Sequence, residues 1–167
     1  MGISDHIPLL IQQYGYLIVF FGVLLGSAGI PIPGQIILIA SGVLAQQGYL
    51  DLRNALVFGI LGAVAGAQIG YWVGHKKGHS VILRWGPYIL VTPERLALAE
   101  RLFRDHGGKT VLFARFMPGL RVFSALLAGI SGMNRKTFLF YNVLGGVLWP
   151  TIMVLLVGYL IAYLLLS

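Results

Sequence analysis

Two long uncharged apolar runs indicate that this chain folds in a lipid bilayer. Residues 55–74 and 138–166 are each long enough to cross a bilayer as a helix, which takes about 20 residues. Shorter apolar runs lie before and between them and end at prolines and glycines. In lipid every backbone polar group needs an internal partner, so these runs have to be helical. The pattern predicts an all-α integral membrane protein that crosses the membrane several times.

The composition agrees with lipid as the main solvent. Of the 167 residues, 57% are hydrophobic and only 10% are charged, against roughly 25% charged residues in soluble domains. The length allows one membrane domain, residues 1–167. Because the chain has no cysteine, disulfides and Cys-based metal or cluster sites are excluded. We predict no metal site and no cofactor.

The net charge of +7 comes from lysines and arginines gathered in a few polar segments. Seven of them lie in the polar centre, residues 75–109, and Arg135 and Lys136 fall in a short break between apolar runs. Such clustering is the orientation signal of membrane proteins, whose cytoplasmic loops are enriched in Lys and Arg. We therefore expect the central basic segment on the cytoplasmic side, and we expect no nucleic-acid partner.

A proline–glycine break interrupts the first apolar region. It covers residues 29–35, and a second apolar run at 36–45 follows it. Proline lacks the amide N–H and clashes with the preceding turn, so the break stops a continuous helix. Broken backbone at membrane depth is tolerated only where protein buries it or where it lines a cavity. We interpret the break as the tip of a re-entrant hairpin, with candidate substrate-binding residues Pro33, Gly34 and Gln35.

The second half of the chain repeats this order of features. Met117, Pro118 and Gly119 interrupt the apolar residues 110–130, and a basic turn and a long apolar run follow. Each half holds one hairpin and one crossing, an odd number of passes, so the halves are predicted to be inverted relative to each other. Matching breaks in the two halves of a transporter point to its substrate site. The two repeats cover about residues 14–74 and 110–166.

The polar centre between the repeats contains an amphipathic helix that we expect to lie on the membrane surface. Thr92 is a typical N-cap, Pro93 fits the first helical position, and Glu94 places an acid in the first turn. Gly107 ends the helix. The apolar face of this helix consists of Leu96, Leu98, Leu102 and Phe103. A further short interfacial segment is expected at residues 5–13.

Arg115 and Arg121 flank the second break and are the sharpest functional signal in the sequence. An ionisable residue at membrane depth costs roughly 2.5–3.5 kcal/mol on insertion scales. The break exposes backbone N–H groups, which favour anions, and each guanidinium offers a planar fork of donors for phosphate oxygens. We interpret the two arginines, with Pro118 and Gly119, as a site for an anionic headgroup. The alternative is structural: each arginine satisfies loose carbonyls at the hairpin tip or extends to the interface.

The five acids of the chain all lie in terminal or polar segments, so neither hairpin arginine has an evident internal partner. An unpaired buried charge is unfavourable, and an anionic lipid headgroup would relieve that cost. Gln35 and Gln68 are candidates to line a polar cavity, although buried amides are often structural. Trp72, Trp85 and Trp149 are interpreted as part of an aromatic belt at the membrane surface.

Two features leave alternatives open. Glycines recur on one face of the helix predicted at 55–74, from Gly59 to Gly70, and allow close approach of another helix. This face is as suitable for a homodimer as for an internal contact. Pro150 interrupts the last apolar stretch, which is therefore either one long kinked helix or two short ones.

The motifs of both halves resemble those of the DedA family of membrane proteins, also called SNARE-associated or VTT-domain proteins. The most specific match is the segment from Phe113 to Arg121, FARFMPGLR, followed by Ala128-Gly129 and Met133. Further matching segments are IPGQ at 32–35, QIGYW at 68–72, TPER at 92–95 and HGGK at 106–109. The resemblance covers residues 15–160.

This resemblance implies two facing re-entrant hairpins and the translocation of lipids. Bacterial members are associated with recycling the lipid carrier undecaprenyl phosphate or with moving phospholipids, and eukaryotic members scramble lipids. The chain is therefore expected to be a flippase or scramblase of the bacterial inner (plasma) membrane, and not an enzyme. The two hairpin arginines of the family correspond to Arg115 and Arg121.

Three positions depart from the family pattern. Many members carry acids late in the first apolar run, after the first proline–glycine pair and before the QIGYW segment. At these positions the chain has Gly26, Gln35 and Ala67. The acids are tied to proton coupling in the family, so their joint loss predicts passive lipid exchange or energy coupling from another source.

Two other functions are left as alternatives. A membrane enzyme acting on lipid phosphates needs a nucleophile or base near the arginines, and the membrane segments offer only Ser41, Ser124, Ser131 and scattered tyrosines. A structural or assembly protein would tolerate the loss of Arg115 or Arg121, whereas a transporter would not. The sequence leaves open which lipid is moved and in which direction.

Overall fold

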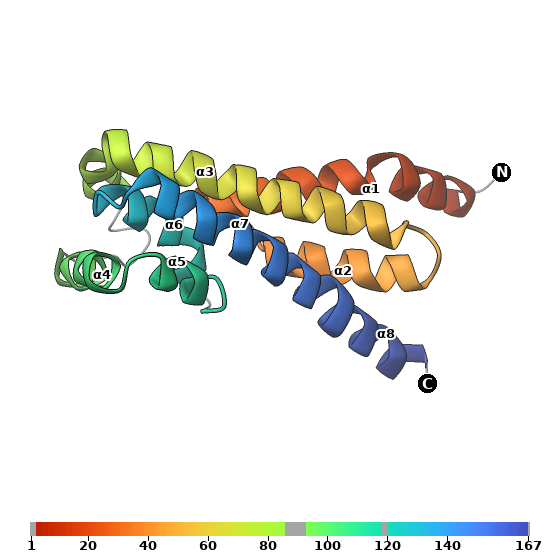
Figure 1. Cartoon of the computed structure of the whole chain (residues 1–167). Coiled ribbons are helices and arrows are strands. Elements are labelled where there is room, and N and C mark those ends of the chain that lie inside the picture. The colour runs from red at the N-terminus through yellow and green to blue at the C-terminus, as the bar shows by residue number, and fades with distance from the viewer. Residues whose placement is uncertain (1–2, 86–92, 118–119, 167) are drawn as a thin grey trace.

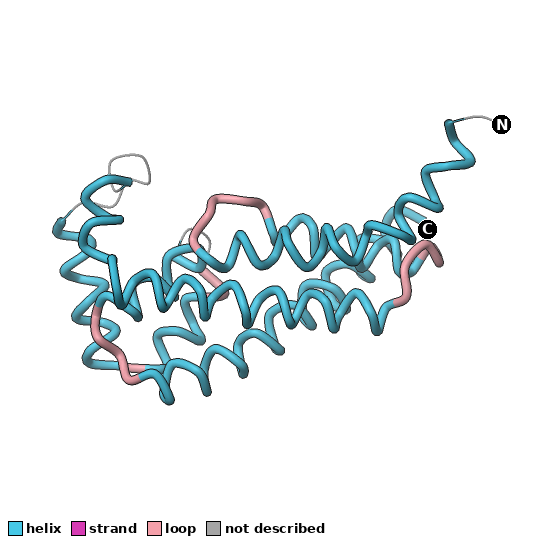
Figure 2. The backbone as a smooth tube through the Cα atoms, turned by 90° about the horizontal axis from the view of Figure 1, so that it is seen from above, coloured by secondary structure: helices cyan, strands magenta, loops and turns pink. Residues whose placement is uncertain are grey.

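The computed structural model describes residues 3–85, 93–117 and 120–166, which form helices joined by short turns. No strand occurs within these ranges, which confirms the predicted all-α class for them. The long helices lie along one axis, with α1 (Ile3–Ala28) and α3 (Leu52–Trp85) side by side (Figure 1). Figure 2 shows from above how short the loops between the helices are.

The first half of the chain forms α1 (Ile3–Ala28), α2 (Gly34–Gln46) and α3 (Leu52–Trp85). The predicted break between the first two helices is present, and Gly29 enters it with a φ of +111°. A side chain rarely adopts this φ, whereas glycine does so freely. The chain then turns back so that α2 packs against α1.

Two helix boundaries in this half differ from the prediction. The interfacial segment expected at residues 5–13 is not separate, because α1 is continuous from Ile3. The helix predicted at 55–74 runs on to Trp85, into the predicted polar centre. Lysines are good helix formers and no proline intervenes, so the change from apolar to basic residues does not end the helix.

The amphipathic helix of the polar centre is confirmed as α4 (Pro93–His106). Its predicted apolar face is divided: Phe103 is buried in the core, whereas Leu98 and Leu102 are exposed. Thr92, the predicted N-cap, lies outside the described residues. The short α5 (Gly108–Ala114) and α6 (Leu120–Ile130) follow, on either side of the second break. Pro118 and Gly119 at that break also lie outside the described residues.

The last apolar stretch is one continuous helical path (Figure 1). It consists of α7 (Arg135–Thr151), the π-helical segment η2 (Ile152–Gly158) and α8 (Tyr159–Leu166). Pro150 removes one backbone N–H donor and crowds the preceding turn, and the helix is wider directly after it. The choice between one helix and two is thereby decided in favour of one.

Two helical stretches are long and apolar enough to cross a membrane, Leu52–Gly78 and Arg135–Gly158. They pack against each other and run antiparallel. Tyr71, late in α3, stacks on Phe138 at the start of α7, with ring centroids 4.3 Å apart. Gly59, early in α3, lies instead beside Pro150 at the end of α7. The end of the first stretch and the start of the second therefore lie on the same side of the bundle.

The short helices pack across the two halves of the chain. α6 of the second half lies on α3, and α2 of the first half lies on η2. The second contact depends on two glycines, since a Cβ at Gly158 would be 2.9 Å from the Cα of Gly42. The short helix after each break therefore packs against the long helix of the other half: α2 against η2, and α6 against α3.

The glycine face of α3 serves internal contacts. A Cβ at Gly62 would be 2.6 Å from the Phe20 carbonyl oxygen of α1, and one at Gly70 would be 3.1 Å from that of Ala28. Further along α3, Gly74 faces the backbone of α6. Because these glycines are covered by α1 and α6, a homodimer would need a different face.

Candidate functional site

Arg115 directly follows α5 and is buried, with 4% of its surface exposed. Its Nη2 donates a hydrogen bond to Oδ1 of Asn142 on α7 and lies 3.5 Å from the Ala63 carbonyl oxygen of α3. Its Nε is also buried and has no hydrogen-bond partner within the described residues. The guanidinium therefore lies between α3 and α7, with its buried Nε–H left without an acceptor there.

Asn142 holds this arginine in place. The amide is fully buried, and its Nδ2 donates to the Val64 carbonyl oxygen of α3 at 3.1 Å. Gly145, one turn further along α7, leaves the space that the arginine side chain occupies, because a Cβ there would be 2.7 Å from Cδ of Arg115. The hydrogen bonds of Asn142 thus tie the start of the second break to both long helices.

Arg121 is the second residue of α6 and is only partly buried. Its Cζ lies 4.2 Å from the centroid of the Trp149 ring, which places the guanidinium over the ring face as a cation–π pair. Trp149 itself is 1% exposed. Its interpretation as part of an aromatic belt was wrong, whereas Trp72 is exposed. The side chain of Trp85 lies outside the described residues.

One face of α7 carries the partners of both arginines. Asn142 and Trp149 are seven residues apart, which is two helical turns or about 10 Å along the same face. An amide and an aromatic ring are both neutral, so neither cancels the charge of its arginine. Within the described residues no acid forms an ion pair with either arginine, whose contacts are with Asn142, the Ala63 carbonyl oxygen and Trp149. The arrangement therefore concentrates uncompensated positive charge beside the second break.

The first break approaches this region through Gly29. A Cβ at Gly29 would be 3.7 Å from the carbonyl oxygen of Val122, the residue after Arg121. Gly34 is buried against Gly22 of α1, whereas Pro33 and Gln35 are exposed. Among the described residues no hydrogen bond joins Gln35 to either arginine. The backbone of the first break, rather than its glutamine, is what the structure brings close to the arginines.

Gln68, on α3, lies beside a groove on the outside of the bundle. Its Oε1 is buried and has no hydrogen-bond partner in the described part of the chain. The residue lines a groove on the outside of α3 together with Arg135 at the start of α7. Gln68 lies one helical turn after Val64, the acceptor of Asn142, but within the described residues no hydrogen bond joins it to either arginine.

Comparison with known proteins agrees with the resemblance of the motifs. Residues 32–163 match the VTT domain. The chain belongs to the VTT-domain family. Its relatives include the uncharacterized membrane protein slr0232 of Synechocystis sp., 41% identical over 90% of this chain and 69% of the relative. Protein DedA of Escherichia coli is 28% identical over 89% of this chain and 71% of its own length.

A third relative of this VTT-domain protein is named alkaline phosphatase-like protein, from Lactococcus lactis. It is 30% identical over 92% of this chain and 74% of the relative. No solved structure matches the chain. Family membership, the names of relatives and the two apolar stretches together establish a membrane protein of the DedA type.

Sequence reasoning missed the two partners that α7 supplies in this VTT-domain protein. The lack of acids in the apolar runs indicated no evident internal partner; no acid pairs with either arginine in the described residues, but the neutral partners Asn142 and Trp149 were not predicted. Asn142 was available as a signal, since it is the one amide side chain in the apolar residues 138–166. Trp149 gave no such signal, because a tryptophan in a membrane helix is as easily placed at the interface.

Proposed function

We propose that this VTT-domain protein moves a phosphate-bearing lipid across the membrane, such as undecaprenyl phosphate or a phospholipid. The observation that carries the proposal is the neutral character of the partners of Arg115 and Arg121. A buried charge without a countercharge is unfavourable, and a phosphate would supply the missing anion. A purely structural arginine in a membrane protein would be better served by a carboxylate.

The two arginines have different parts in this proposal. Arg121 meets the headgroup, because it is partly exposed and its donors are not used by hydrogen bonds to described residues. The flat contact with Trp149 leaves the edge of its guanidinium free for phosphate oxygens. Arg115 is a positioning residue that also adds positive charge, since Asn142 holds it out of contact with solvent.

The packing of the helices supports an inverted repeat of re-entrant hairpins. α2 lies on the long helix of the second half and α6 on that of the first, as expected for two similar units that exchange their short arms. The two breaks would then face each other near the middle of the membrane, with the lipid chains left in the bilayer. The basic side, with α4, would be cytoplasmic.

The positions where acids are absent support exchange without proton coupling. Gly26 is buried in the first hairpin, and a Cβ there would already be 3.2 Å from the Ile32 carbonyl oxygen. Ala67 is buried in the core. Neither position has room for a carboxylate without rearrangement. We therefore propose that the lipid moves down its own gradient.

Lipid movement in proteoliposomes tests the function. Labelled polyprenyl phosphate and labelled phosphatidylethanolamine are offered in parallel, with and without a pH gradient. Arg121→Ala is expected to slow translocation at least about tenfold, since it removes one charge-assisted contact worth roughly 1.5–3 kcal/mol. Arg121→Lys should be intermediate, because it keeps the charge but loses the planar fork. Arg104→Ala, on exposed α4, is the matched control and should leave the rate unchanged.

The folded state of each variant is checked by thermal unfolding in detergent. A native-like Arg121→Ala that still moves both lipids at the wild-type rate would contradict the headgroup site and favour a structural role. Dependence on the pH gradient would contradict passive exchange. Release of inorganic phosphate from the polyprenyl phosphate would instead favour hydrolysis, the activity suggested by the name of the Lactococcus lactis relative.

A further inference from the structure

A groove of about 360 Å³ lies on the outside of the bundle, between α3 and the start of α7. Its wall is mostly apolar, and Arg135 provides the one charge among its lining residues. The residues that line it are Gln68, Ile69, Trp72, Val73 and Arg135. Neither Arg115 nor Arg121 is among these lining residues.

Lys76 adds a second cation next to this groove. Its Nζ lies 3.6 Å from the centroid of the Trp72 ring, which is one helical turn earlier on α3. Lys76 and Arg135 lie near the end of one apolar stretch, Leu52–Gly78, and at the start of the other, Arg135–Gly158. Because the two stretches run antiparallel, both cations come to the same membrane boundary, with the apolar wall extending from there toward the membrane interior.

The position of Arg135 relative to α3 is held by Tyr71. The Tyr71 hydroxyl donates to the Met133 carbonyl oxygen at 2.6 Å, in the turn just before α7. The Tyr71 ring also stacks on Phe138, so the first turn of α7 is fixed on α3 from both sides of Arg135. The backbone positions on both sides of the groove are therefore fixed by contacts between α3 and the start of α7.

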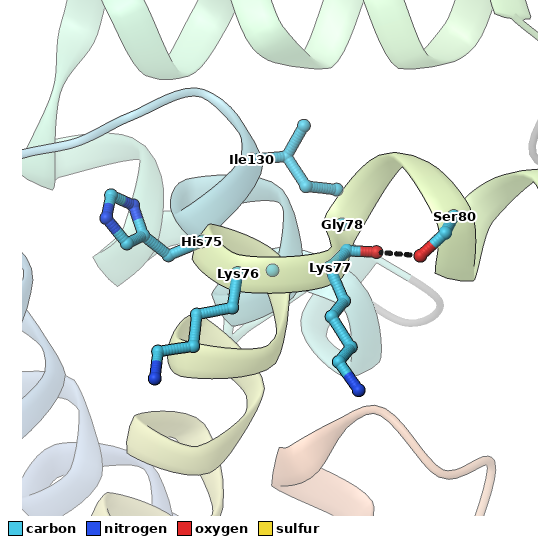
Figure 3. A pocket seen from close by; sticks show the side chains of 7 residues that line it. His75, Lys76, Lys77, Gly78, Ser80 and Ile130 are labelled. Atoms are coloured by element: carbon cyan, nitrogen blue, oxygen red, sulfur yellow. Dashed lines mark hydrogen bonds between the residues drawn. The ribbon is translucent and has the colours of Figure 1, made fainter.

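A second hollow, of about 330 Å³, lies further along α3, where Lys76 and Lys77 are among its lining residues. Figure 3 shows Lys76 and Lys77 extending to one side of α3, with His75 directed away from them and Ile130 near Gly78. No lining residue of either hollow is acidic. The surface around the groove mouth thus favours an anion.

We propose that the groove binds one anionic phospholipid. Its phosphate lies between Lys76 and Arg135, and its acyl chains follow Ile69 and Val73. Trp72 packs beside the glycerol region, as tryptophans do at membrane surfaces. Basic pockets between membrane helices are the kind of site that anionic lipid headgroups occupy. This lipid is a resident ligand on the basic side of the protein, distinct from any lipid that is moved.

Binding of defined lipids to the purified full-length chain tests this site. The dissociation constants of dioleoyl phosphatidylglycerol and dioleoyl phosphatidylcholine are measured in detergent by native mass spectrometry. We expect the wild type to prefer phosphatidylglycerol. The variant Lys76→Gln/Arg135→Gln should weaken phosphatidylglycerol binding about fivefold for each lost charge and leave phosphatidylcholine binding unchanged. Both side chains are exposed, so the fold is expected to be retained.

Lys136→Gln is the matched control. It removes the same charge one residue after Arg135, but Lys136 lines a different, apolar hollow with Leu139 and Phe140. An equal loss of preference in this control would overturn the proposal, because it would show a diffuse effect of net charge. An unchanged preference in the double variant would overturn it as well. So would displacement of the lipid by inorganic phosphate at equal concentration, since a free anion would then be the ligand.

Discussion

Replacing Asn142 with leucine is expected to lower the free energy of unfolding by about 2–4 kcal/mol, because it leaves two buried polar groups without a partner at roughly 1–3 kcal/mol each. The substitution removes the acceptor of Arg115 and leaves a buried, charged donor without this hydrogen bond. It also leaves the Val64 carbonyl oxygen without the donor of Asn142. Thermal and denaturant unfolding of the purified protein in detergent would measure the loss.

The double variant Arg115→Met/Asn142→Leu separates this cause from poor packing of leucine. Replacing both partners of a buried polar pair by apolar groups is often nearly neutral, so most of the lost stability should return. If the double variant were as unstable as the sum of the two single variants, the leucine would not fit. The hydrogen bond would then not be the reason for the loss.

Gly66→Ala is expected to destabilise the protein by about 3 kcal/mol, at the upper end of the range for overpacked cores. A Cβ at Gly66 would overlap the carbonyl group of Leu24, so α1 and α3 would have to move apart along their whole contact. An alanine in a helix otherwise adds stability relative to glycine, which makes the expected sign unusual. The same unfolding experiments in detergent would measure it.

Gly59→Ala is the control for this prediction. It lies on the same helix, and its added Cβ would meet the Cδ2 methyl of Leu38 at 2.8 Å. A flexible side-chain end can turn away at little cost, whereas a backbone carbonyl cannot. Equal destabilisation by the two alanines would mean that close backbone approach is not what requires glycine at Gly66.

The helices were predictable because each depends on local features. Prolines and glycines mark both breaks, and apolar runs of sufficient length mark the long helices. The errors occurred where no local signal exists, as at the end of α3, which passes from apolar to basic residues without a helix breaker. Pro150 shows the same limit: a break or kink was foreseeable there, but the sequence did not show that the path continues as the π-helical segment η2, which packs against α2.

The candidate site was predicted in its charges but not in its partners. Arg115 and Arg121 stand out because an ionisable residue within an apolar run is rare, whatever surrounds it. Their partners come from α7, which is 27 residues further along the chain in the case of Asn142. No spacing rule connects these positions. In the same way, Gln68 and Arg135 share a groove only because α3 and α7 lie antiparallel.

The membrane environment, the helical class, the two breaks and the excess of positive charge could be predicted, because they follow from composition and from the nearest neighbours of each residue. That the glycine face of α3 is covered from within became clear from the packing of α1 and α6 on it. The tertiary structure also decided that neutral groups hold both arginines. The physical reason is that both outcomes depend on which helix faces meet, and that is set by packing between segments far apart in the chain.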